Sequence, residues 1–95
     1  MNINLKKIKA IVSGKVQGVG FRMYTCAQAK HLGVSGYVRN LRNGDVEIVA
    51  AGEAKRVDEL LEWAKSGAPS AIVNNLKFEV MNYTDEEFSD FEIRR

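Results

Sequence analysis

The stretch that decides the fold lies in the middle of the chain and reads Val34-Ser35-Gly36-Tyr37-Val38-Arg39-Asn40-Leu41-Arg42-Asn43-Gly44-Asp45-Val46-Glu47-Ile48-Val49-Ala50. Its first half is rich in residues that favour strands. In its second half Val46, Ile48 and Ala50 recur at every second position, the spacing of one face of a strand. Between the halves, Asn43-Gly44 predicts a two-residue type I′ turn, because both residues tolerate the positive φ that this turn requires. The stretch therefore predicts an antiparallel β-hairpin.

A strand and a helix are predicted before this hairpin. Ile8, Ala10 and Val12 alternate along residues 7–13, which indicates a half-buried strand. Residues 21–32 contain helix formers and no breaker. Gly33 then stands where helices commonly end in a left-handed residue.

A second helix and further strands are predicted after the hairpin. One apolar face of a helix is formed by Val57, Leu60, Leu61 and Ala64. Gly67 and Pro69 end this helix. Alternating apolar residues within 76–81 predict another strand, and those within 88–93 predict a short terminal strand.

The predicted order of elements is β-α-β-β-α-β, followed by the short terminal strand. A hairpin between two strand–helix units matches the ferredoxin-like split βαβ sandwich of the α+β class. We therefore expect an antiparallel sheet with two helices on one face and the other face largely open to water. Because this fold supports many functions, the function must be inferred from the site.

Length and composition narrow the class of protein. A chain of 95 residues suits one domain, so we expect residues 1–95 to form a single domain. The net charge of +2 is too small to indicate nucleic acid as a partner. The single cysteine, Cys26, excludes an internal disulfide, and no apolar run has the length of a signal peptide or a membrane span. We expect a cytoplasmic monomer with no membrane partner.

Three glycines precede the first predicted helix, in the segment Gly14-Lys15-Val16-Gln17-Gly18-Val19-Gly20-Phe21-Arg22. Glycine lets a ligand approach the backbone closely, and successive N–H groups in such a loop can bind an anion. The start of the helix would add N–H donors, and Arg22 would add a guanidinium. Glycine-rich turns between a strand and a helix also arise for geometric reasons alone. The loop by itself leaves both interpretations open.

Two known nucleotide-binding loops do not fit this segment. A Walker loop ends in Gly-Lys followed by Ser or Thr, whereas here Gly20 is followed by Phe21 and Arg22. The dinucleotide fingerprint needs a third glycine where Met23 stands, and a much longer chain. Neither nucleotide interpretation holds.

The glycine segment and the hairpin together resemble the two signature blocks of the acylphosphatase family, and the resemblance extends over nearly the whole chain. The residues that carry it are Gly14-x-Val16-Gln17-Gly18-Val19-Gly20-Phe21-Arg22, Gly36-Tyr37-Val38-Arg39-Asn40-x-x-Asn43-Gly44-x-Val46-Glu47 and the ending Phe91-Glu92-Ile93. The chain departs from the family pattern at Arg42, where proline is frequent. It also departs at Ser66-Gly67-Ala68-Pro69, which replaces a commoner Gly-Pro-Pro turn. Both departures lie outside the catalytic positions.

The resemblance implies a hydrolase that cleaves the carboxyl-phosphate anhydride bond of acyl phosphates. Its small-molecule partners would be the acyl phosphate and the product inorganic phosphate. By motif position, Arg22 would bind the phosphate group and Asn40 would hold the attacking water. The backbone N–H groups that complete the phosphate site would be those of Val16, Gln17, Gly18, Val19, Gly20, Phe21 and Arg22.

These residue types suit the chemistry. Phosphoryl transfer has a loose transition state, so positioning and charge stabilisation matter more than a strong base. A carboxylate leaves readily, so a guanidinium and a ring of amides can suffice without a metal or another cofactor. The carbonyl of Asn40 can accept a hydrogen bond from water and orient it. Our hypothesis is that the water proton passes to a phosphate oxygen. The single histidine, His31, is explained by the preference for cations near a helix C-terminus.

Two other classes of function stay open. The same fold could carry a non-catalytic module that binds anions or RNA, but RNA binding on this fold uses exposed aromatic residues, and the predicted strands lack an aromatic-rich motif. It could also be a regulatory domain, like the acylphosphatase-like segment at the start of larger hydrogenase-maturation proteins. Because the chain ends at Arg95 without zinc-type cysteines, we expect a free-standing enzyme. No residue outside the phosphate site indicates which acyl group is used.

Overall fold

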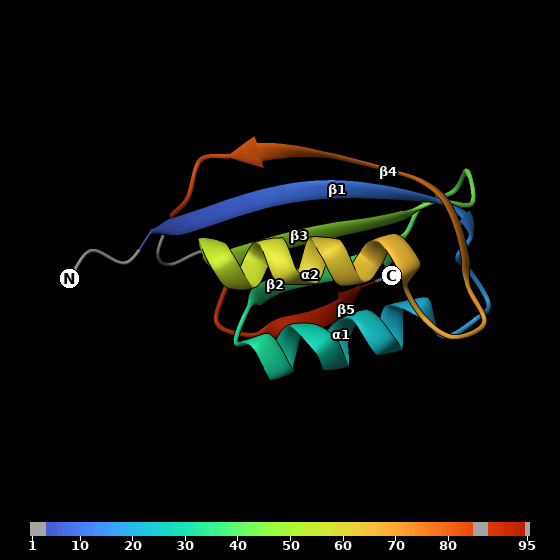
Figure 1. The fold of residues 1–95 in the computed structure, drawn as a ribbon, viewed down its shortest axis with the longest axis horizontal. Helices are drawn as coiled ribbons and strands as arrows, with labels where there is room; N and C mark the ends of the chain where they lie inside the picture. Colours follow the sequence, from blue (N-terminus) through green and yellow to red (C-terminus); the bar gives the residue numbers. More distant parts are fainter. Residues whose placement is uncertain (1–3, 85–87, 95) are drawn as a thin grey trace.

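The computed structural model describes residues 4–84 and 88–94. Its elements, in chain order, are β1 (Leu5–Lys15), α1 (Phe21–Leu32), β2 (Ser35–Asn40), β3 (Val46–Glu53), α2 (Ala54–Ser66), β4 (Ile72–Met81) and β5 (Phe91–Arg94) (Figure 1). The predicted first helix is confirmed. It ends at Gly33, whose φ is 72° and whose N–H bonds to carbonyls of the last turn. Within the described residues, neither helix has the length and apolar character needed to cross a membrane.

The strands form one five-stranded sheet in the order β4-β1-β3-β2-β5. Both helices lie on the same side of this sheet (Figure 1). β1 pairs antiparallel with β3 and β4, and β2 pairs antiparallel with β3. The ferredoxin-like α+β arrangement is therefore confirmed. Its four strands, β1 to β4, pair antiparallel as predicted. β5 adds a parallel pair with β2, and this places the end of β5 beside the end of β2.

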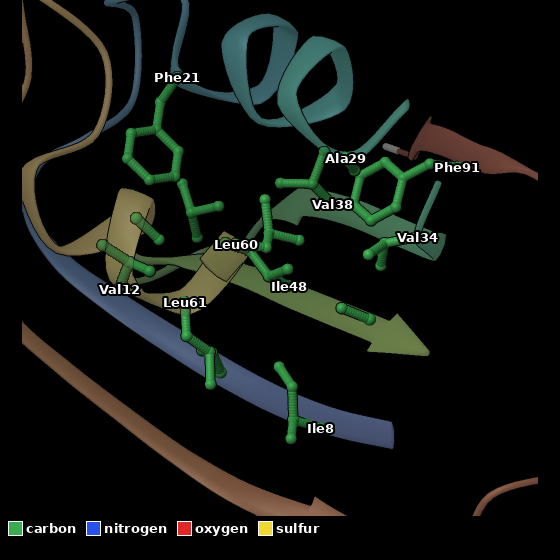
Figure 2. Packing of buried hydrophobic residues seen from close by; sticks show 14 of the residues in the cluster. Ile8, Val12, Phe21, Ala29, Val34, Val38, Ile48, Leu60, Leu61 and Phe91 are labelled. Atoms are coloured by element: carbon green, nitrogen blue, oxygen red, sulfur yellow. The ribbon is translucent and has the colours of Figure 1, made fainter. Parts of the chain in front are cut away.

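The core lies between the sheet and the two helices (Figure 2). Ile8 and Val12 lie on the same face of β1, because alternate residues of a strand share one face. Both point into the core and have no exposed surface. Phe21 is only 1% exposed, and its ring centroid lies 5.8 Å from that of Trp63 on α2. Burying a side chain of this size contributes about 1.5–3 kcal/mol. Phe21 therefore anchors the first turn of α1, and with it the backbone of the neighbouring Arg22.

The hairpin forms as predicted, but its turn is not the predicted type I′ turn. β2 and β3 are joined by residues 41–45, and Gly44, with φ 97°, carries the positive φ in this loop. The Gly44 N–H donates to the Leu41 carbonyl (3.2 Å), and the Leu41 N–H donates to the Asp45 carbonyl (2.8 Å). This pattern is the longer hairpin loop, in which a tight turn is followed by one left-handed glycine. Asn43 needs no positive φ there, and its Oδ1 accepts a hydrogen bond from the Asp45 N–H.

The second face of the sheet is open to water along β4 and β5, as predicted, but its centre on β1 and β3 is covered, which was not predicted. Lys7 and Glu47 are only 7% and 4% exposed on that face, and Val49 is buried beside them. Phe88, from the segment between β4 and β5, packs against this face. Its ring centroid lies 6.1 Å from that of Tyr37 and 5.5 Å from the Lys7 Nζ. Strand alternation could not predict this cover, because it comes from a segment outside the strands.

The buried carboxylate of Glu47 is the centre of a polar cluster on that face. The Tyr37 hydroxyl donates to Glu47 Oε1 (2.9 Å), and so does the Arg39 Nε (2.9 Å). The Lys9 Nζ lies 3.8 Å from Glu47 Oε2. Burial alone raises the pKa of the Glu47 carboxyl, but the hydrogen bonds and the two cations outweigh it. The pKa of Glu47 therefore lies below its ordinary value.

This cluster predicts an acid-sensitive contribution to stability. A carboxyl with a lowered folded-state pKa stabilises the fold above its unfolded-state pKa of about 4.3, and the benefit is lost as pH falls through the folded-state value. We expect Glu47→Gln to lower the free energy of unfolding at neutral pH by about 1–3 kcal/mol, because Arg39 and Tyr37 lose a charged acceptor. Urea unfolding of both proteins at neutral pH and at about pH 3 measures this, and the difference should shrink in acid. Glu62→Gln, with a side chain 76% exposed, is the control. An equal loss at both pH values would contradict the explanation.

Candidate active site

The connection between β1 and α1 forms a loop that can bind an anion. We call residues 16–22 the cradle loop. Gly18 and Gly20 have φ values of 74° and 78°, a left-handed backbone conformation that residues other than glycine rarely adopt. Gly20 is the N-cap of α1, no side chain caps this end, and the first turn holds no acidic residue. The first helical bond is from the Tyr24 N–H to the Gly20 carbonyl (3.0 Å). The N–H groups that precede Tyr24 lack helical acceptors, so they can serve an anion.

Arg22 lies in the first turn of α1, where the positive end of the helix dipole also favours an anion. Its Nη1 is 3.5 Å from the Arg94 carbonyl of β5, which is a long hydrogen bond. Within residues 4–84 and 88–94 the guanidinium makes no other hydrogen bond or ion pair. Because a guanidinium carries five N–H donors, most of them are available to a ligand.

Asn40 is the last residue of β2 and directly follows Arg39, which pairs with Arg94 of β5. Its Oδ1 is buried, and in the described part of the chain no group donates a hydrogen bond to it. A buried acceptor without a donor costs about 1–3 kcal/mol. Side chains placed in this way are typical of functional sites. The side-chain carbonyl of Asn40 can therefore accept a hydrogen bond from a bound molecule.

The cradle loop, Arg22 and Asn40 meet at one pocket of about 170 Å³. The residues that line it are Val16, Gly18, Gly20, Phe21, Arg22, Met23, Asn40 and Ile93. The structure thus brings together the two side chains that the sequence singled out. Gln17 and Val19 belong to the cradle loop but are not part of the lining. The Gln17 amide bonds to the β2–β3 loop, and Val19 packs against the core.

Two lining residues were not predicted from the sequence. Met23 and Ile93 are 64% and 45% exposed and add apolar surface to the pocket. Met23 follows Arg22 in the first turn of α1, so its position beside Arg22 in the sequence could have identified it as a pocket residue. Ile93 enters only because β5 pairs parallel with β2, and the local pattern of residues does not specify that partner.

The chemistry of the pocket is that of a donor site for an anion. Among the described residues its polar groups are backbone N–H donors, one guanidinium and one amide, with no carboxylate or imidazole in the lining. Among the described residues, His, Cys, Asp and Glu side chains form no group of three or more that could hold a metal ion. His31 lies in the last turn of α1, as predicted, and does not line the pocket.

Comparison with known proteins points to one family. The profile of the family described as Acylphosphatase matches residues 8–93 of this chain. An acylphosphatase from Acaryochloris marina is 50% identical over 92 residues, which cover 97% of both chains. The solved structure of an acylphosphatase from Coxiella burnetii is 44% identical, with a TM-score of 0.89 over 96% of this chain and 94% of that one. The acylphosphatase structure from Bacillus subtilis is 32% identical and also has a TM-score of 0.89, over 97% and 100% of the two chains.

Proposed function

The chain belongs to the acylphosphatase family and hydrolyses acyl phosphates to a carboxylate and inorganic phosphate, and on this premise we propose how its residues carry out the reaction. Arg22 and the N–H groups of the cradle loop bind the phosphoryl group. Asn40 holds the water that attacks it. The observation that carries this assignment is that the Arg22 guanidinium, the cradle loop and the buried Asn40 carbonyl share one pocket.

In the proposed reaction the oxygen of the bound water attacks phosphorus. The bond between phosphorus and the acyl oxygen breaks, and the carboxylate leaves with that electron pair. One proton of the water passes to a phosphate oxygen. Arg22 and the cradle N–H groups stabilise the charge on the phosphoryl oxygens as the loose transition state forms. Asn40 cannot remove a proton at neutral pH, so its part is to orient the water through its carbonyl.

We propose that residues 1–95 act as a single domain and a monomer, in the cytoplasm, without a nucleic-acid or membrane partner. The residues of the proposed mechanism, which are Arg22, Asn40 and the cradle loop, all belong to the same chain, so the mechanism calls for no residue of a second copy. The small net charge of +2 supports a small-molecule partner over nucleic acid. The comparisons lend no support to a non-catalytic anion-binding, RNA-binding or regulatory function. A filter-binding assay with RNA tests the second of these directly.

We also propose that hydrolysis needs no metal ion, since the lining offers N–H donors that contact an anion directly. The expected result is that metal-free protein hydrolyses benzoyl phosphate at the same rate with and without a chelator. Inorganic phosphate should act as a competitive inhibitor, because product and substrate share the cradle. The measurement is the decrease of benzoyl phosphate absorbance during steady-state turnover. A rate that vanishes with the chelator and returns with a divalent cation would overturn the proposed mechanism.

A further inference from the structure

Gln17 connects the cradle loop to the β2–β3 loop. Its Nε2 lies 2.8 Å from the Leu41 carbonyl oxygen and 2.8 Å from the Asp45 carbonyl oxygen. A primary amide nitrogen carries two N–H donors, so these two bonds use both of them. The backbone of Gln17 lies between Val16 and Gly18, which line the pocket. One side chain therefore joins the phosphate-binding half of the site to another loop.

The two acceptors of Gln17 form the base of the β2–β3 loop. The Leu41 N–H donates to the Asp45 carbonyl at 2.8 Å, so these two residues are bonded to each other as well as to Gln17. Asn40 directly precedes Leu41 and is joined to it by one planar peptide bond. Holding Leu41 in place therefore restricts where Asn40 and its buried Oδ1 can lie.

We propose that Gln17 is a positioning residue that holds Asn40 at the correct distance from the cradle loop and thereby aligns the attacking water with the phosphorus. The inference rests on the proposed role of Asn40. The attacking water is held at the end of β2 by Asn40, and the phosphoryl group is held by the cradle loop. Gln17 is bonded from the cradle loop to the β2–β3 loop that directly follows Asn40. A misplacement of about 1 Å at a reacting centre can cost about 10²-fold in rate. The Gln17 side chain does not contact the substrate, because both of its amide N–H donors are used within the protein. Only the backbone N–H of Gln17 belongs to the phosphate-binding cradle loop.

A positioning role differs in its consequences from a purely structural one. A structural brace would lower the stability of the folded protein and leave the folded fraction fully active. A residue that shaped the cradle alone would change the affinity for phosphate. A residue that acts through Asn40 lowers kcat, leaves phosphate binding almost unchanged, and has no further effect once the Asn40 side chain is removed.

The test uses two variants of the full chain. Gln17→Met keeps the length of the side chain without its donors, and Gln17→Asn keeps the amide but is one methylene too short to reach both carbonyls. For both we expect kcat on benzoyl phosphate to fall by about 10–10²-fold, with the inhibition constant of inorganic phosphate changed less than about threefold. Thermal unfolding checks that each variant is folded at the assay temperature. Gln28→Met, a half-buried glutamine on α1 that does not line the pocket, is the matched control and should keep the wild-type kcat.

The decisive measurement is the double variant with Asn40→Ala. We expect Gln17→Met to change kcat by less than about twofold in that background, because the group it positions is gone. An undiminished loss there, or a folded Gln17→Met protein with wild-type kcat, would overturn the inference. A loss of phosphate affinity equal to the loss of kcat would overturn it too. These failures are distinct from failure of the proposed function, which would show as wild-type turnover by the Asn40→Ala single variant.

Discussion

We expect Arg22→Ala to lower kcat/KM for benzoyl phosphate by at least about 10²–10³-fold, the usual cost of removing one preorganised electrostatic donor. The guanidinium is held in the first turn of α1 next to the buried Phe21, and within the described residues its one hydrogen bond is the long contact to the Arg94 carbonyl. Most of its N–H donors are therefore available to a phosphoryl group. Inhibition by inorganic phosphate should weaken in parallel, because substrate and product use the same donor.

Arg22→Lys separates charge from geometry. Lysine keeps a positive charge but lacks the planar pair of donors that matches two phosphate oxygens. We expect its rate to lie between those of the wild type and Arg22→Ala. The control is Arg56→Ala on α2, whose side chain is 50% exposed and pairs with Glu59 away from the pocket. The measurement is the steady-state rate of each variant, and circular dichroism checks that each variant is folded. Near-normal turnover by Arg22→Ala would remove Arg22 from the mechanism.

Asn40→Ala is the second variant with a large expected effect, a loss of kcat of about 10²–10³-fold. The loss should fall mainly on kcat, because Asn40 holds the water and the phosphoryl group is bound by Arg22 and the cradle loop. Inorganic phosphate should therefore still inhibit, with an inhibition constant close to that of the wild type. This pattern distinguishes the variant from Arg22→Ala, in which phosphate binding is lost as well.

Stability gives Asn40→Ala a second readout. The Asn40 Oδ1 is buried without a donor in the described part of the chain, so removing it eliminates a desolvation cost instead of a hydrogen bond. We expect the free energy of unfolding, measured in urea, to be unchanged or higher. Asn75→Ala, at an exposed position of β4, is the control for both measurements and should match the wild type. An inactive Asn40→Ala protein that is also strongly destabilised would instead indicate a structural role.

Much of the fold could be predicted because its signals are local. The helix over residues 21–32 follows from helix formers that end at Gly33, and the apolar face of α2 follows from helical spacing. The hairpin was predictable as a hairpin, but its turn type was not. Asn43-Gly44 is compatible with more than one loop, and the hydrogen bonds that Leu41 makes with Asp45 and Gly44 identify the longer one.

The candidate site was predictable only as far as its motifs reach. Arg22, Asn40 and the cradle loop came from two sequence blocks, and the structure places them around one pocket. Ile93 and the Gln17 side chain were missed as contributors because each acts through a partner far away in the chain. The packing of Phe88 against Tyr37 and Lys7 on the second face was missed for the same reason.

The amino-acid sequence by itself determined the order of the helices and strands, the hairpin at the centre and the residues available for phosphate chemistry. Periodicity, glycine and proline act over a few neighbouring residues, so they can be interpreted without knowing the fold. The tertiary structure alone decided that β5 lies parallel to β2 and that Gln17 joins the two halves of the site. It also decided that the side-chain carbonyl of Asn40 is buried with no donor among the described residues. Each of these depends on contacts between residues far apart in the chain, which form only when the sheet and helices pack together.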